Sequence, residues 1–195
     1  AEGMGGLIFG PEDIADCPII DGMGLGPAVT VCDDSSVNGF VIRNTDTASP
    51  AIKAAVFYSV DDLVDISRVG VYGANCSDIS IADSLIAGNS IGILIHKDGR
   101  GPGVAHSDFF AELSGVTVQD NDGVGAMLLG HGGSGVYDVT ITDSVFNRTG
   151  GTNGLQIGAF GYDSVDVRLA NIQADENGEC GVVVDLGYND WNLAV

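Results

Sequence analysis

Four stretches of the sequence repeat one order of strand, turn and strand, and this internal repeat constrains the fold more than any other feature. They span 77–96, 113–130, 137–158 and 164–185. Alternation of apolar and polar residues is typical of a β-strand with one buried face, and a repeat of 20–50 residues is typical of a solenoid. Each stretch opens on such an alternating pair: Ile79/Ile81, Val116/Val118, Val139/Ile141 and Val167/Leu169.

A second landmark of the repeat is a glycine that precedes its last short apolar strand. The successive spacings are 33, 29 and 27 residues. Strands this short are stable only when each pairs with its equivalent in the next repeat, which stacks the inward Val, Ile and Leu side chains into one core. The four aligned glycines are Gly92, Gly125, Gly154 and Gly181.

The repeat therefore predicts an all-β chain, a parallel β-helix with three short strands per coil, formed by residues 1–195 as a single domain. Helical periodicity is nearly absent, and the regular leucine spacing of leucine-rich repeats is missing. An ordinary β-sandwich also has short strands and turns, but the aligned Gly and Asp positions favour the solenoid.

The opening segment 19–47 and later coils such as VTITDSVFNRTGGTNGLQI resemble the right-handed parallel β-helix proteins of the pectin-lyase-like superfamily. This resemblance implies the right-handed form of the solenoid. It covers nearly the whole chain but is carried by the repeat pattern, so it implies a fold more than an activity.

The charge of the chain excludes several partners. It has 27 acidic residues against 7 basic ones, a net charge of −20, with 22 Asp and only 5 Glu. Nucleic acid and anionic lipid surfaces are excluded as partners because so few basic residues cannot neutralise phosphates. We expect no membrane insertion, since no apolar run is long enough to span a bilayer. Many Asp and few Lys also resemble the surfaces of salt-adapted, halophilic proteins.

The segment Gly130-His131-Gly132 and the residues after it resemble the polygalacturonase-type glycoside hydrolases. That family combines Asn-Thr-Asp, Asp-Asp, Gly-His-Gly and Arg-x-Lys motifs; the aspartates hydrolyse the glycosidic bond and the basic pair holds a uronate. Here Asp46 is displaced in sequence, and Gln156 and Gly158 replace the basic pair. The catalytic candidates that the resemblance leaves are Asp46, Asp61, Asp62 and His131.

The repeat is interrupted by a segment that we expect to be an insertion loop, residues 97–112. Insertions on one face of a solenoid often line its binding surface. Exposed aromatic rings beside polar groups suit stacking against sugars, although Phe109 and Phe110 could instead fold back over the core. The substrate-binding candidates here are His96, Lys97, Arg100, His106, Phe109 and Phe110.

Aspartates recur after the alternating strands. Stacking in register would place Asp83, Asp120, Asp143 and Asn171 in one file, and Asp78, Asp138 and Asp166 in a second file. Turns favour Asp for its side-chain hydrogen bonds to the backbone, whereas Ca²⁺ prefers several oxygen ligands. The first file is the candidate metal site, with Ca²⁺ as its ion.

Three functions remain open for a secreted or surface-exposed protein of this kind. The first is a structural or carbohydrate-recognition module, because the repeat is well ordered while the catalytic motifs are incomplete. The second is a polysaccharide hydrolase or lyase with an atypical set of residues. The third is a filament or adhesin segment that associates through uncapped coil ends. Among the cysteines, Cys17 and Cys32 form the plausible local pair, and we expect Cys76 and Cys180 to be buried thiols.

Overall fold

The computed structural model describes residues 17–44, 68–98, 108–132, 134–187 and 191–195. These residues form β-strands, turns and bends without a helix, and every strand pairing among them is parallel. The strands are β1 (Ile19–Asp21), β2 (Val29–Val31), β3 (Ser36–Asn38), β4 (Val41–Arg43), β5 (Val69–Ala74), β6 (Ile79–Ala82), β7 (Leu85–Ala87), β8 (Ile91–Asp98), β9 (Phe109–Ser114), β10 (Thr117–Gln119), β11 (Ala126–His131), β12 (Val136–Asn147), β13 (Asn153–Phe160), β14 (Ser164–Gln173), β15 (Cys180–Asp185) and β16 (Trp191–Ala194).

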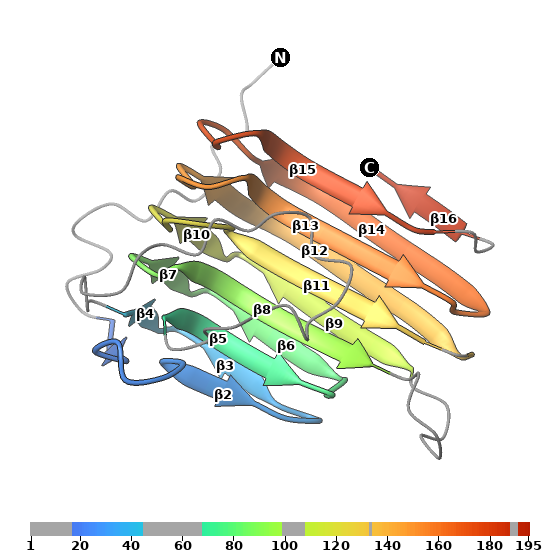
Figure 1. Ribbon diagram of the computed structural model, residues 1–195, viewed down its shortest axis with the longest axis horizontal. Helices are drawn as coiled ribbons and strands as arrows, with labels where there is room; N and C mark the ends of the chain where they lie inside the picture. Colours follow the sequence, from blue (N-terminus) through green and yellow to red (C-terminus); the bar gives the residue numbers. More distant parts are fainter. Residues whose placement is uncertain (1–16, 45–67, 99–107, 133, 188–190) are drawn as a thin grey trace.

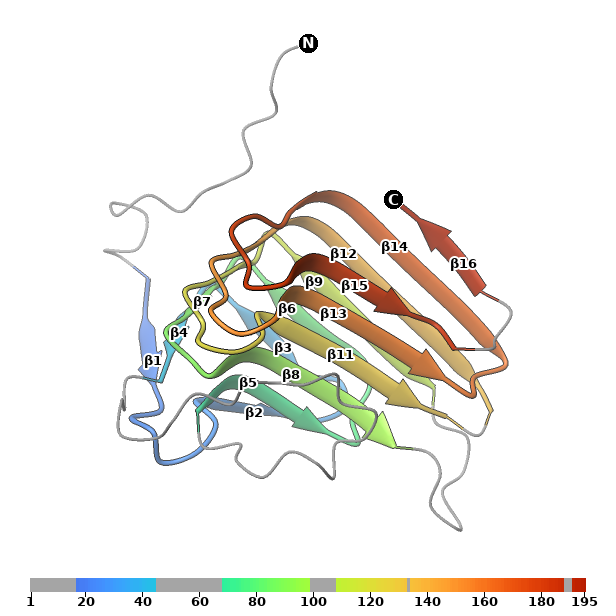
Figure 2. The ribbon, with the colours of Figure 1, turned by 45° about the horizontal axis from the view of Figure 1, so that its top comes forward.

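The strands make two sheets that curl around a common core (Figures 1 and 2). The six-stranded sheet has the order β15-β13-β11-β8-β5-β2. The ten-stranded sheet has the order β1-β4-β7-β10-β12-β9-β6-β3, with β14 on β12 and β16 on β14. The expected all-β, parallel architecture is confirmed, and the arrangement is compatible with a solenoid.

Within these sheets the strands form three columns. The first column holds β1, β4, β7, β10 and the ends of β12 and β14. The second holds β3, β6, β9, the starts of β12 and β14, and β16, and the third is the six-stranded sheet. The chain visits the third, second and first columns in turn before it returns to the third. Each visit adds one strand to the edge of each column, which explains why all pairings are parallel.

The glycine alignment is confirmed by the register of the third column. Ala126 lies opposite Ile93 on one side and Leu155 on the other, and Leu155 lies opposite Val182. The glycine just before each of these residues therefore falls in one line across the sheet, as the repeat predicted.

The core lies between the sheets and consists of inward-pointing side chains. In β12, Tyr137, Val139 and Ile141 are fully buried, and the residues between them are partly exposed. Phe109 stacks on Tyr137 with 4.8 Å between the ring centroids and 7° between the planes. β-branched and aromatic residues suit such a half-buried pleated surface.

Buried asparagines stabilise the corner between the first and third columns. The Nδ2 of Asn89 donates to Oδ1 of Asn121 at 3.0 Å, and the Nδ2 of Asn121 donates to the Ile86 carbonyl at 3.4 Å. One step along the stack, the Thr149 hydroxyl donates to Oδ1 of Asn177 at 3.0 Å. These hydrogen bonds pair polar groups at a buried bend where water is excluded.

All four cysteines are free thiols. Cys76 is buried as expected, but Cys180 is exposed because β15 lies at the edge of the six-stranded sheet, where no further strand covers it. Burial, followed by the nearby Asp33 carboxylate, raises the pKa of the Cys76 thiol to about 11.

Candidate functional site

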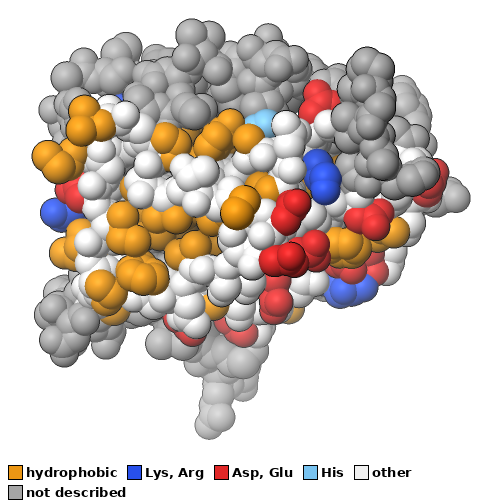
Figure 3. All heavy atoms as spheres, turned by 90° about the horizontal axis from the view of Figure 1, so that it is seen from below, with side chains coloured by type: hydrophobic (Ala, Val, Ile, Leu, Met, Phe, Trp, Pro, Cys, Tyr) orange, Lys and Arg blue, Asp and Glu red, His pale blue; other side chains and the backbone are white. Residues whose placement is uncertain are grey.

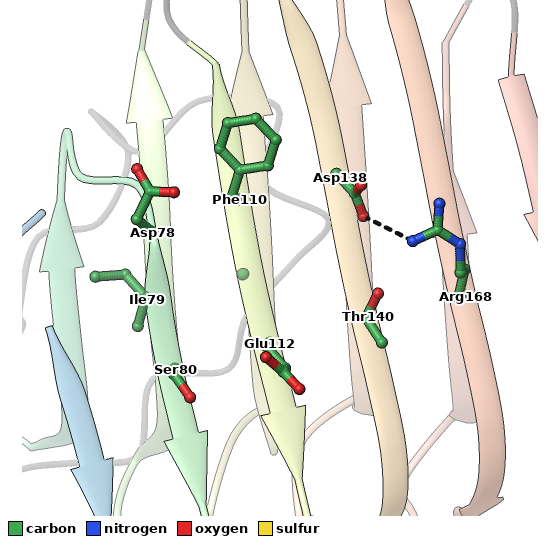
Figure 4. A pocket seen from close by; sticks show the side chains of 9 residues that line it. Asp78, Ile79, Ser80, Phe110, Glu112, Asp138, Thr140 and Arg168 are labelled. Atoms are coloured by element: carbon green, nitrogen blue, oxygen red, sulfur yellow. Dashed lines mark hydrogen bonds and ion pairs between the residues drawn. The ribbon is translucent and has the colours of Figure 1, made fainter. Parts of the chain in front are cut away.

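An open groove of about 440 Å³ crosses the outer face of the second column. It spans β6, β9, β12 and β14, so it runs along the stacking direction rather than along any strand (Figure 4). Its lining combines one aromatic ring, hydroxyl groups, carboxylates and one guanidinium. The residues are Asp78, Ile79, Ser80, Phe110, Ala111, Glu112, Asp138, Thr140 and Arg168.

The period of two along each strand places these side chains outside. Where Ala111, Val139 and Val167 point into the core, the residues on either side of them point outward. The register then aligns the outward residues across the strands. One line holds Ser80, Glu112, Thr140 and Arg168, and the next holds Phe110, Asp138 and Asp166.

The predicted second file of aspartates is confirmed by this register. Asp138 lies directly opposite Asp166, and Phe110 lies opposite Asp138 on the other side. Asp78 precedes Ile79, which is paired with Ala111, so Asp78 belongs to the same line. Within the groove, Asp78 and Asp138 therefore lie on either side of Phe110.

The single guanidinium of the groove is already occupied. Arg168 donates to Oδ1 of Asp138 at 3.5 Å and also to a carboxylate oxygen of Asp166. Asp78 and Glu112 are exposed and have no basic residue beside them in the groove lining. The groove therefore has a negative potential, which attracts cations and repels polyanions.

The two adjacent phenylalanines predicted to bind substrate lie on opposite faces of β9. Phe109 is fully buried against Tyr137, so it belongs to the core. Phe110 points outward into the groove and is partly exposed (Figure 4). Side chains alternate between the two faces of the strand, so of these two phenylalanines only Phe110 is placed to contact a ligand.

The other binding candidates of the described chain lie on the six-stranded sheet, away from the groove. His96 is in β8, where its Nε2 lies 3.3 Å from the Tyr72 hydroxyl. Lys97 follows it and donates from Nζ to the Asp108 carbonyl at 2.9 Å. His131, a catalytic candidate, ends β11 and stacks on Phe160 at 4.9 Å. The structure does not bring these residues to the groove.

Several predicted residues fall outside the described part of the chain: Asp46, Asp61, Asp62, Arg100 and His106. The expected insertion 97–112 is described only at its ends. Lys97 and Asp98 end β8, and 109–112 form part of β9; 99–107 lie outside the described residues.

The aspartates predicted to bind a metal divide between two corners. Asp83 and Asp143 share a line with Gly115 and Asn171, and all four have a positive φ, from 45° to 63°. Asp120 lies at the next corner, beside Gly88 and Arg148. The expected single file is wrong because β9 occupies 109–114, which shifts Val116/Val118 and the following Asp120 by one column.

Two of these three aspartates are bound by other side chains of the protein. Asp143 accepts a hydrogen bond from Nδ2 of Asn171 at 2.8 Å. Asp120 accepts two from Arg148, at 2.7 and 2.8 Å, and these bonds lower the pKa of its carboxyl. Among the described residues, no group of three or more His, Cys, Asp or Glu side chains is placed to hold a metal ion.

The groove residues that sequence reasoning missed are Ser80, Glu112, Thr140 and Arg168. Their signal was present, because each occupies the polar position between two apolar residues of an alternating strand. They share one surface only through the register across four strands. That register could not be predicted, because residues 109–112 were assigned to a loop and not to strand β9.

A second cavity, of about 590 Å³, lies at the C-terminal end of the stack. Its lining is almost entirely apolar and comes from β14, β15 and the residues around β16. The residues are Leu169, Ala170, Asn171, Ile172, Ala174, Val182, Val184, Leu193 and Val195.

Comparison of the chain with protein-family models, with curated proteins and with solved structures found no significant match. The described residues contain no helix long and apolar enough to cross a membrane.

Proposed function

We propose that the chain is a right-handed parallel β-helix of a secreted or surface-exposed protein, and that it recognises a carbohydrate in the groove of the second column. Three strand columns visited in a fixed order support the helical form. Crossovers between parallel strands of one sheet are right-handed in about 98% of cases. The superfamily resemblance supports the same hand.

The observation that carries the carbohydrate proposal is the position of Phe110 in the groove. Its ring is partly exposed and lies between Asp78 and Asp138, and Glu112 follows two residues along the same strand (Figure 4). An aromatic face packs against the C–H groups of a sugar, while neighbouring hydroxyls and carboxylates bind its O–H groups. The groove crosses four strands, and this length suits a chain of sugars rather than a single one.

The charges of the groove define the class of glycan. Asp78 and Glu112 carry uncompensated negative charge, and Arg168 is already bound to Asp138 and Asp166. A polyuronate would place its carboxylates against these groups. The groove thus favours uncharged polysaccharides or polymers of amino sugars, whose ammonium groups complement the carboxylates.

A binding screen with matched variants tests this proposal. Isothermal titration with a neutral glucan, a neutral galactan, a glucosamine polymer and a polygalacturonate should show binding to a member of the first three classes. Phe110→Ala should weaken that binding at least about tenfold, whereas Phe110→Tyr should retain it. Circular dichroism before and after heating confirms that both variants are folded. Absence of binding to every polysaccharide would leave only a structural role.

The hydrolase alternative is supported by a different observation, that Glu112 and Asp138 lie in the same groove on adjacent strands. They are diagonal neighbours on adjacent parallel strands, which lie about 4.8 Å apart with about 3.3 Å per residue, so their side chains can bring two carboxyl groups across the groove toward one another. Inverting hydrolysis uses two carboxyl groups about 6.5–9.5 Å apart. Release of reducing sugar that is lost in both Glu112→Gln and Asp138→Asn would establish this activity. Binding without such release would establish recognition alone.

A further inference from the structure

Each end of the stack leaves strand edges without a partner among the described residues. At the N-terminal end, β1, β2 and β3 pair on one side only, with β4, β5 and β6. At the C-terminal end, β15 pairs only with β13, and β16 only with β14. An open edge presents unpaired N–H and C=O groups that can accept a further strand.

The large hydrophobic side chains that are exposed within the described chain occur only at these two ends. Ile19, Met23 and Leu25 lie in and after β1, and Leu25 is 87% exposed. At the other end Val182, Leu193 and Val195 are exposed beside the apolar cavity. Among the described residues, the surface between the two ends exposes no comparable large hydrophobic side chain. The exposed apolar side chains therefore lie where the strand edges are open.

The N-terminal end of the stack presents both apolar and acidic side chains. Figure 3 views this end from below and shows hydrophobic side chains gathered over one part of it and acidic side chains over another. Ala28, Val29 and Phe40, which pack on the core, are only partly buried here. A docked strand layer would cover these apolar groups and gain the free energy of their burial.

We propose that a second copy of this chain docks head to tail, with the β1–β3 end of one molecule on the β15–β16 end of the next. The columns match: β2 faces β15 in the third column, β3 faces β16 in the second, and β1 faces the end of β14 in the first. All pairings within the molecule are parallel, and head-to-tail stacking continues them with the same strand direction. A two-fold contact between identical ends would reverse the strand direction.

Acidic residues at both ends oppose this contact at low ionic strength. Asp33 and Asp34 are exposed near the N-terminal end, and Asp175, Glu176 and Asp185 are exposed near the other. Added salt shortens the range of their repulsion, to about 3 Å at 1 M. Association should therefore strengthen as NaCl is raised, in contrast to a contact between opposite charges.

Sedimentation velocity of the 195-residue chain, from micromolar to millimolar concentration and at low and molar NaCl, tests the proposal. The expected result is association that increases with both variables. Leu25→Asp at one end and Val182→Asp at the other should each raise the dissociation constant at least about tenfold. Gln119→Asp, in the middle of the stack, adds the same charge and should leave association unchanged. Val195→Asp replaces a side chain that is 96% exposed and serves if Val182→Asp fails to fold.

Mixing the two end variants distinguishes head-to-tail docking from a two-fold contact. Each variant alone should be a monomer, whereas the mixture should form dimers and nothing larger, since it contains one intact end of each kind. Dimers of Leu25→Asp alone would show docking between identical C-terminal ends and would overturn the proposal. A wild-type chain that stays monomeric under all conditions would overturn it as well.

Discussion

A single methyl group added at Gly92 should destabilise the fold, because the backbone of the next coil lies directly against this glycine. A Cβ built on Gly92 would lie 2.5 Å from the Gly125 carbonyl oxygen and 2.6 Å from Cγ1 of Val118. Ordinary van der Waals contact begins near 3.4 Å, so the Gly125 carbonyl must move by about 0.9 Å. Neither neighbour is the free end of a flexible side chain, so the movement must involve the backbone of the next coil.

The magnitude follows from what that movement disrupts. The Gly125 carbonyl accepts the Ile93 N–H at 2.9 Å, a bond of the sheet ladder. Overpacking a core costs about 1–3 kcal/mol, and the net loss of a hydrogen bond costs about 1 kcal/mol. Gly92→Ala should therefore lose about 2–4 kcal/mol. For a chain of this length the melting temperature should fall by roughly 5–15 °C.

Thermal unfolding followed by circular dichroism measures this effect, with two glycines as controls. A Cβ on Gly26 meets nothing within 4 Å, so Gly26→Ala should change stability by less than about 0.5 kcal/mol. Gly39 also faces open space but has a φ of 77°, so Gly39→Ala isolates backbone strain, of about 1–2 kcal/mol. A loss of about 2 kcal/mol should lower the melting temperature by at least about 4 °C. If Gly92→Ala melts within about 2 °C of Gly26→Ala, the close approach of the coils is refuted.

Three further predictions concern the charges and thiols. Cys76 is buried and its pKa is raised to about 11, so at pH 8 its thiol should react with a disulfide reagent only on unfolding. The exposed thiols of Cys32 and Cys180 should react at once. Equal reaction rates for all thiols would contradict this prediction. The Asp120 carboxyl has a lowered pKa in the folded protein, so its contribution is complete above its unfolded pKa of about 3.9 and is lost as the pH falls through the folded value. Because the pair with Arg148 is exposed, Asp120→Asn should cost at most about 1 kcal/mol at pH 7, and urea unfolding should show that difference vanish in acid; a difference independent of pH would exclude the ion pair as its cause. The net charge of −20 should make the melting temperature rise with NaCl, and a flat response in calorimetry would reject salt adaptation.

The aligned glycines show what the spacing of residues in the sequence can establish. Their spacing was readable because every coil needs a residue without a side chain at the same point, and the structure places Gly92, Gly125 and Gly154 in register. The line of Asp138 and Asp166 was readable for a similar reason, since both precede an alternating strand that pairs with its equivalent. Features that recur in each coil leave a periodic signal in the sequence.

Features that depend on one coil alone were not readable in this way. The strand at 109–114 follows a stretch of sequence that interrupts the repeat, and without the strand's register Phe110 and Glu112 could not be assigned to a surface. The same gap in the prediction grouped Asp120 with Asp83 and Asp143, whereas in the structure its neighbour is Arg148. The sequence also could not tell that Cys76 is buried while Cys180 is exposed. Cys180 is exposed because β15 lies at the edge of its sheet.

The sequence by itself determined that this chain forms short parallel strands, because alternation, turn residues and glycines recur with each coil and local physics is the same at every repeat. Only the tertiary structure decided which outward side chains share a surface. The groove around Phe110 and the apolar ends of the stack arise from pairing between strands distant in sequence. Shifting one strand by a single residue would turn its inward side chains outward, so the site depends on a register that no single segment specifies.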